Sequence, residues 1–218
     1  MKTQQLLLNL ELPTTFDASD FIVGSCNADA YTWVIRWPDW PTRTLAIYGP
    51  TGCGKSHLAT IWQQKSQAHW ISSQAIPAPT SVHPGRAIIV EGQPVDVRAY
   101  LHLYNYVREN KGCILLIDHE PPARWSVSLP DLRSRLLAVP ALEIAHPDET
   151  VLAAVCVKLF TDQQIKVSPE CIEYMLPRVE RSFKSVSSLV SALGKYSLER
   201  QKPITIPLIR HVLEHSNS

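Results

Sequence analysis

The chain lacks a charge excess of either sign. Its 218 residues include 21 Lys and Arg against 20 Asp and Glu, a formal net charge of +1. This balance gives no long-range attraction to DNA or to acidic membranes, so we expect no sequence-specific DNA reader. The sequence also stops soon after its last expected helix, which leaves little room for a helix-turn-helix module. A hydrophobic content of 45% is sufficient for a buried core, which excludes a disordered chain.

Long apolar runs and metal-ligand spacings are missing too. No stretch approaches the roughly 20 residues of a transmembrane helix, and the N-terminus lacks the charged region and cleavage site of a signal peptide. We therefore expect a cytoplasmic protein without membrane contact. The five cysteines are scattered without CxxC spacing, and the eight histidines show no ligand pattern. These spacings argue against disulfides and against any metal other than a nucleotide-bound Mg²⁺.

The most informative motif is a complete phosphate loop, G-x-x-x-x-G-K-[ST], over residues 49–56. Its glycines let backbone N–H groups curl around phosphates, Lys55 reaches the outer phosphoryl oxygens, and the Ser56 hydroxyl binds Mg²⁺. An apolar run precedes the loop and a helix-compatible segment follows it, which is the setting that anion binding requires. We therefore predict binding of ADP or ATP with Mg²⁺. The predicted binding residues here are Gly49, Pro50, Thr51, Gly52, Cys53, Gly54, Lys55, Ser56 and His57.

Around this loop, strand-like and helix-like segments alternate, which implies an α/β fold with a parallel sheet flanked by helices. The expected strands cover residues 45–48, 69–72, 87–91, 113–118 and 141–145. The expected helices between them cover residues 28–37, 55–64, 97–110 and 130–138.

After Pro147 the pattern changes to helices only. Ser168 and Pro169 predict a helix start with a capping serine and a proline at the first position, and Thr205 can cap the last helix. The expected helices cover residues 148–162, 168–179, 183–199 and 207–214. We therefore divide the chain into an N-terminal docking tail, a nucleotide-binding base domain and an all-helical lid domain, over residues 1–15, 16–147 and 148–218.

Two acidic residues compete for the Mg²⁺ site, Glu91 and Asp118, each at the end of an apolar strand. If Asp118 held the metal, only ten residues would separate it from the segment 129–136, too few for the further strand that such folds need. Spacing therefore favours Glu91. Because Gly92 follows it, no adjacent carboxylate can activate water, and hydrolysis by this chain alone should be slow or absent. Under the other assignment, Glu120 is the nearby base.

At this point the residues resemble the DnaA-related branch of AAA+ ATPases, and most closely its short regulatory form that lacks a DNA-binding domain. The likeness implies a five-stranded parallel AAA+ sheet with a small helical lid. Residues 20–27 are similar to the family segment that packs near the adenine, with Phe21 and Val23 as contacts. The box LPDLRSRL is similar to the one that carries the family's arginine finger, which by that match is Arg135. The family's lid sensor arginine falls on Lys184, which keeps the charge but not the bidentate fork.

The N-terminal residues 5–10, QLLLNL, are similar to the peptide with which such proteins dock on the sliding clamp, the beta subunit of DNA polymerase III. An extended peptide places alternate side chains into apolar pockets, while the glutamine amide gives directional hydrogen bonds. The contacts implied are Gln5, Leu6, Leu8 and Leu10.

Together these features favour a regulator that docks on the clamp and promotes hydrolysis of DnaA-bound ATP through Arg135. Two alternatives stay open. One is a self-sufficient AAA+ ATPase such as a helicase loader or remodelling factor, which uses Asp118 or Glu91 with Glu120. The other is an adaptor whose nucleotide never switches. The residues also leave open whether the chain forms a homo-oligomer.

Overall fold

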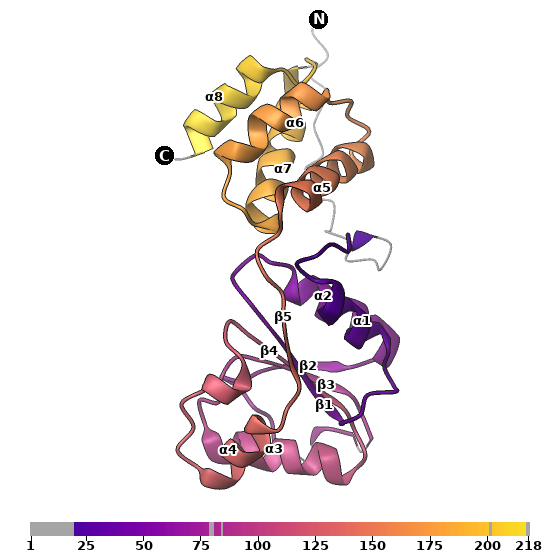
Figure 1. The fold of residues 1–218 in the computed structure, drawn as a ribbon, viewed down its shortest axis with the longest axis vertical. Coiled ribbons are helices and arrows are strands. Elements are labelled where there is room, and N and C mark those ends of the chain that lie inside the picture. Colours follow the sequence, from indigo (N-terminus) through magenta and orange to yellow (C-terminus); the bar gives the residue numbers. More distant parts are fainter. Residues whose placement is uncertain (1–19, 79–80, 84, 201, 217–218) are drawn as a thin grey trace, which may run out of the picture.

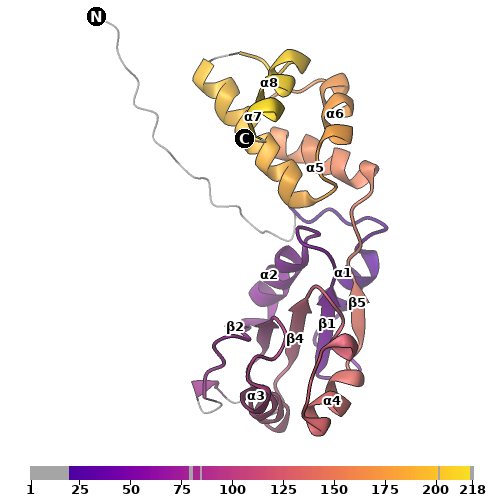
Figure 2. The same cartoon turned by 90° about the vertical axis from the view of Figure 1, so that its left-hand side faces the viewer.

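The protein's structure is a computed structural model that describes residues 20–78, 81–83, 85–200 and 202–216. The predicted clamp-docking residues lie outside this part. Figures 1 and 2 show two domains stacked along the long axis of the molecule, with the helical lid above the α/β base domain.

The base domain is built on a five-stranded sheet in the order β2-β3-β4-β1-β5, and every pairing in it is parallel. This confirms the predicted fold class. The strands are β1 (Thr44–Tyr48), β2 (His69–Ser72), β3 (Ile88–Glu91), β4 (Ile114–Asp118) and β5 (Ala141–Glu143).

Two pairs of helices cover the two faces of the sheet. Successive strand residues point to opposite faces, so Leu45 and Ile47 pack against α1 and α2, whereas Ala46 belongs to the cluster with α3 and α4. All three residues are fully buried, as expected for strands covered on both faces. The helices are α1 (Ala28–Ile35), α2 (Lys55–Ser66), α3 (Val97–Glu109) and α4 (Pro130–Leu137), with a short 3₁₀ helix η3 (Pro122–Arg124) before α4.

The lid has its own apolar core, whose buried residues all lie between Leu152 and Val212 and include the fully buried Phe160. Its elements are α5 (Glu149–Asp162), α6 (Pro169–Met175), the 3₁₀ helix η4 (Leu176–Arg178), α7 (Phe183–Arg200) and α8 (Ile206–Ser216).

Two details of the lid differ from the sequence prediction. The helix expected over 168–179 ends as an α-helix at Met175 and continues as a 3₁₀ turn, because Pro177 cannot donate a backbone hydrogen bond. Ser168 occupies the cap position before α6, but its side chain makes no capping hydrogen bond. Within the described residues, no helix is both long and apolar enough to cross a membrane.

Candidate functional site

The phosphate loop joins the end of β1 at Tyr48 to the start of α2 at Lys55. Gly52 and Gly54 adopt φ angles of +74° and +101°, which residues with a side chain rarely adopt. Gly54 is the left-handed cap of α2. The loop therefore ends at a helix N-terminus, whose free N–H groups favour an anion.

The Lys55 side chain is buried and folds back over its own loop. Its ammonium donates to the carbonyl oxygens of Gly49 and Pro50 at 2.7 and 2.8 Å. A bound phosphate has to compete with these two carbonyls for the ammonium, and its negative charge gives it the stronger hydrogen bond. Burial raises the pKa of the neighbouring Cys53 thiol, so Cys53 packs here as a neutral thiol.

The two candidate acids both lie at the carboxyl edge of the sheet, on neighbouring strands. Asp118 pairs with Tyr48, and its carbonyl accepts a hydrogen bond from the Gly49 N–H at 3.3 Å. Its Oδ1 accepts from the His119 N–H at 2.7 Å, whereas its buried Oδ2 has no partner among the described residues. Glu91 lies one strand further from β1, where its exposed carboxylate accepts from Trp70 Nε1 at 2.9 Å.

This arrangement agrees with the spacing argument, because β4 is a further strand after the one that ends at Glu91. The described residues contain no group of three or more His, Cys, Asp and Glu side chains that could hold a metal by themselves. Mg²⁺ commonly binds through one or two carboxylates together with substrate phosphates and water. Ser56 at the start of α2 and one of the two acids fit that smaller role.

The first turn of α7 in the lid lies directly on the phosphate loop. The Phe183 N–H donates to the Gly52 carbonyl at 3.0 Å. A Cβ atom added to Gly52 would lie 3.1 Å from the Cβ atoms of both Ser182 and Lys184. Lys184 therefore stands beside the loop, at the place where the resemblance expects a sensor residue. The backbone contact of Phe183 joins residues 131 positions apart, and nothing in the sequence indicated it.

The segment before α1 lies on the other side of the loop. The Phe21 ring stacks on Tyr31 with centroids 5.5 Å apart and meets the His57 ring edge-on at 5.2 Å. Phe21 also approaches Gly54, whereas Val23 is 46% exposed. The Phe21 and His57 rings thus pack together beside the end of the loop, whereas the Val23 side chain is exposed to solvent.

Polar contacts tie this segment to the lid. Lys158 of α5 forms an ion pair with Asp20 at 2.8 Å. Asp148, the cap of α5, accepts from the Val151 N–H at 2.8 Å and from the Ser25 hydroxyl at 2.9 Å. These hydrogen bonds, that of Val151 first, lower the pKa of the Asp148 carboxyl. The base-lid junction is therefore built from residues next to the nucleotide loop.

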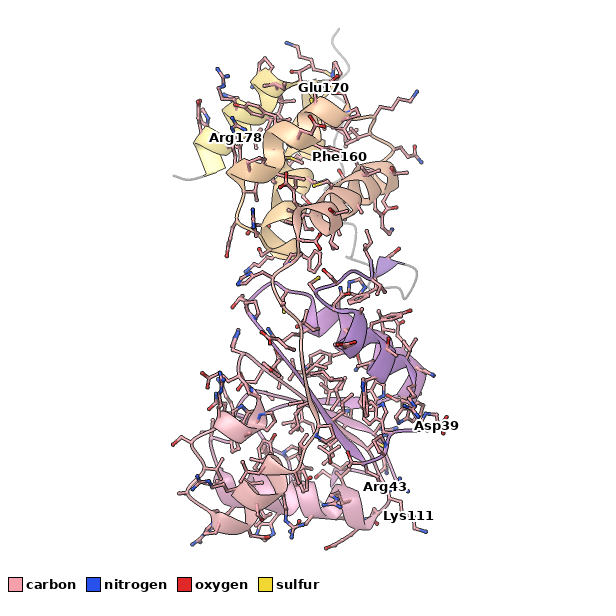
Figure 3. The ribbon with its side chains drawn as sticks, viewed as in Figure 1. Asp39, Arg43, Lys111, Phe160, Glu170 and Arg178 are labelled. Atoms are coloured by element: carbon pink, nitrogen blue, oxygen red, sulfur yellow. The ribbon has the colours of Figure 1, made fainter. Side chains whose placement is uncertain are left out.

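Arg135 lies at the opposite end of β1. It is held by Asp131 one turn earlier in α4, with Nε 3.2 Å from Oδ1, and its side chain is 32% exposed. It lines a cavity of about 630 Å³ together with Thr44, the first residue of β1. Because β1 has five residues, its ends are about 13 Å apart. Arg43 lines the same cavity, and Figure 3 shows it at the end of the base domain away from the lid.

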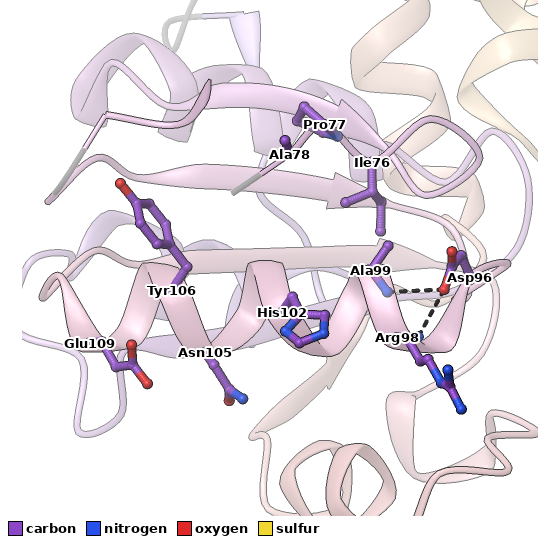
Figure 4. A pocket seen from close by; sticks show the side chains of 10 residues that line it. All are labelled: Ile76, Pro77, Ala78, Asp96, Arg98, Ala99, His102, Asn105, Tyr106 and Glu109. Carbon is purple, nitrogen blue, oxygen red and sulfur yellow. Dashed lines mark hydrogen bonds between the residues drawn. The ribbon is translucent and has the colours of Figure 1, made fainter. Parts of the chain in front are cut away.

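The structure thus gathers most predicted site residues at one edge of the sheet and leaves Arg135 at the other. A second cavity, of about 710 Å³, lies along α3 and contains none of the predicted site residues. Figure 4 shows Asp96 at its end, where the carboxylate caps α3 by accepting from the Arg98 and Ala99 N–H groups. This groove has a mixed lining and is separate from the phosphate loop.

Comparison with known families gives a match for the helical domain. Residues 158–213 match the family model described as "Hda, lid domain". The helical domain is therefore similar to the lid domain of Hda. This match runs from the second half of α5 into α8, so it covers most of the helical region that the sequence predicted.

Solved structures match the fold of the base domain and the helical domain together. Domain III of the Thermotoga maritima replication initiation protein DnaA has a TM-score of 0.78 at 16% identity, over 92% of this chain and 96% of that one. AMPPCP-bound DnaA from Aquifex aeolicus has a TM-score of 0.68 at 16% identity, over 88% and 70%. A Thermotoga maritima RuvB mutant has a TM-score of 0.67 at 15% identity, over 78% and 61%. The fold is that of AAA+ proteins.

A Haemophilus influenzae protein, described as "Uncharacterized protein", is 23% identical to this chain over 185 residues. The match covers 77% of this chain and 80% of that protein.

Proposed function

We propose that this chain is a nucleotide-binding regulator of replication initiation that promotes hydrolysis of ATP bound to DnaA. The match to the Hda lid domain and the fold shared with domain III of DnaA support a role in replication initiation. The resemblance implies that the arginine finger of one molecule reaches the nucleotide of its neighbour, and a chain that shares the fold of DnaA domain III is suited to stack on DnaA itself.

The observation that carries the proposal is the position of Arg135. It lies at the Thr44 end of β1, whereas the phosphate loop follows the Tyr48 end. Arg135 therefore cannot serve the nucleotide on its own loop, and any phosphate that it contacts belongs to another molecule. An arginine supplied in this way stabilises the charge of the transferring phosphoryl group and raises the rate by about 10³ to 10⁵.

The chain's own nucleotide has a structural role in this proposal. ADP or ATP binds over residues 49–57 with Mg²⁺ on Ser56 and Glu91, and Phe21 and Lys184 close the site. The absence of a carboxylate next to Glu91 supports slow turnover. Because Phe183 already contacts Gly52, a ligand in the loop can set the angle of the lid.

The second contact that we propose is with the sliding clamp, through Gln5, Leu6, Leu8 and Leu10, in the cytoplasm. Replacing Gln5, Leu8 and Leu10 with alanine should abolish binding of the full chain to the clamp. Unchanged affinity would remove the clamp from the proposal and leave the role of Arg135 intact.

The test is hydrolysis of ATP bound to DnaA, in the presence of DNA-loaded clamp, by the full chain and two variants. Arg135→Ala should lose the stimulation. Arg133→Ala is the matched control, because Arg133 is an exposed residue of the same helix that does not line the cavity. Equal stimulation by both variants would refute the arginine finger, and no stimulation by the unmodified chain would refute the regulator.

A self-sufficient ATPase is the second candidate, favoured by one observation. The buried Oδ2 of Asp118 has no partner among the described residues, and Asp118 adjoins the first glycine of the phosphate loop. Glu120 follows two residues later and is exposed. Intrinsic turnover that disappears in both Lys55→Ala and Asp118→Asn would favour this candidate, whereas the regulator predicts little turnover in the unmodified chain.

A further inference from the structure

The cavity beside Arg135 contains two more arginines that come from distant parts of the chain. Arg43 precedes β1, and Arg108 lies in the last turn of α3. Asp131 is the only carboxylate among the residues that line this cavity. Three arginines and one carboxylate therefore line a concave space of about 630 Å³, although the chain as a whole is almost neutral.

Each guanidinium is held by a contact that leaves hydrogen-bond donors free for a ligand. Arg43 donates from Nη1 to the Lys111 carbonyl at 2.7 Å. Arg108 lies over the Tyr104 ring, 5.7 Å from its centroid, and its guanidinium has no hydrogen bond or ion pair within the described part of the chain. Because a guanidinium has five N–H donors, both exposed side chains keep donors that a ligand can take over from water.

We infer that this cavity receives the polyphosphate group of a nucleotide bound to a second protein, with Arg43 and Arg108 as positioning residues beside Arg135. The inference rests on the proposed function. The planar guanidinium fork matches phosphate oxygens bidentately, and the cavity also offers the hydroxyl groups of Thr42 and Ser134. This chain's own nucleotide is excluded, because the phosphate loop lies beyond the other end of β1.

In this inference, Arg43 and Arg108 bind the phosphate chain, and Arg135 acts on the reacting phosphoryl group. Arg43 lies just before β1 and Arg108 lies in α3, so the two side chains reach the cavity from separate parts of the fold and can both bind the phosphate chain. Their contacts are the same before and during reaction, and such uniform binding affects the half-saturating concentration. Arg135 stabilises charge that develops during transfer, which affects the maximal rate.

The experiment separates these effects. The full chain is titrated against ATP-loaded DnaA with DNA-loaded clamp, and the half-saturating concentration and the maximal rate are both measured. Arg43→Ala and Arg108→Ala should each raise the half-saturating concentration about tenfold, with the maximal rate unchanged. Arg43→Lys and Arg108→Lys should recover part of the affinity, because the charge returns without the fork. Arg135→Ala should lower the maximal rate.

Arg133→Ala is again the control, and thermal unfolding checks that each variant is folded, since Arg108 also packs on Tyr104. Half-saturating concentrations that match the unmodified chain would overturn the inference and leave the regulator standing. A fall in maximal rate at an unchanged half-saturating concentration would also overturn it. If the unmodified chain gives no stimulation, the proposed function and this inference fail together.

Discussion

The two ends of β1 are built from different parts of the polypeptide. Beyond Tyr48, the phosphate loop presents backbone groups, and even the Lys55 ammonium is hydrogen-bonded to loop carbonyls. At the Thr44 end, the cavity beside Arg135 is lined by long arginine side chains. A backbone cradle is rigid and lies under the lid, so it suits a ligand that stays bound. Exposed side chains at the far end suit a ligand that arrives on another molecule and leaves with it.

The largest effect should come from the end of β1 that holds Arg135. Arg135→Ala should reduce stimulated hydrolysis of DnaA-bound ATP by about 10³, while the variant's own nucleotide affinity stays unchanged because the phosphate loop is distant. Stimulated hydrolysis and nucleotide binding are measured on the same preparation. If Arg135→Ala lost stimulated hydrolysis and nucleotide binding together, the two ends of β1 would not act independently.

A substitution in the phosphate loop, at the other end of β1, should impair binding of the chain's own nucleotide. Lys55→Ala should weaken nucleotide binding between about tenfold and a hundredfold, because a charged hydrogen bond to phosphate is lost. Lys65→Ala is a matched control: Lys65 lies in the same helix and also donates to two carbonyls, those of Ile35 and Trp37, away from the loop. Calorimetric titration with ADP checks both, and similar affinities for the two variants would contradict the assigned role of Lys55.

The contact between loop and lid can be tested at a glycine. Gly52→Ala should destabilise the chain through its φ of +74°, by about 1–2 kcal/mol, and should also push on Ser182 and Lys184. Gly85→Ala is the control, because Gly85 has a φ of +75° and, among the described residues, its added Cβ would meet only the Asn110 carbonyl, at 3.6 Å. Both variants should lose thermal stability, Gly52→Ala at least as much as Gly85→Ala, and only Gly52→Ala should weaken ADP binding. Equal ADP affinities would show that the lid contact does not matter for the site.

The sequence predicted the local parts of this site and missed what folding brings together. The phosphate loop is local, because its function needs fixed residue types at fixed offsets, and the alternation of apolar strand residues is local too. The contact of Phe183 with Gly52 and the gathering of Arg43, Arg108 and Arg135 depend on how distant elements pack. Arg43 and Arg108 carry no motif, so only the shared cavity identifies them.

The smallest effect concerns the junction that holds the lid over the loop. The folded state lowers the pKa of the Asp148 carboxyl, so the unfolded chain binds the proton more readily and stability rises with pH. The contribution is present above the ordinary pKa of 3.8 and is lost as the pH falls through the lower folded value. Asp148→Asn keeps a capping group but cannot titrate, so its melting temperature should fall less steeply below about pH 4.

Ser25→Ala separates the two hydrogen bonds of this carboxyl. It removes only the one from the hydroxyl and keeps the capping bond from Val151, so its pH dependence should lie between those of the unmodified chain and Asp148→Asn. Thermal unfolding over a series of acidic buffers measures all three. If the melting temperatures of all three proteins depend on pH in the same way, Asp148 does not couple the lid to the base. The lid would then be held over the phosphate loop by the Phe183–Gly52 hydrogen bond and the Lys158–Asp20 ion pair.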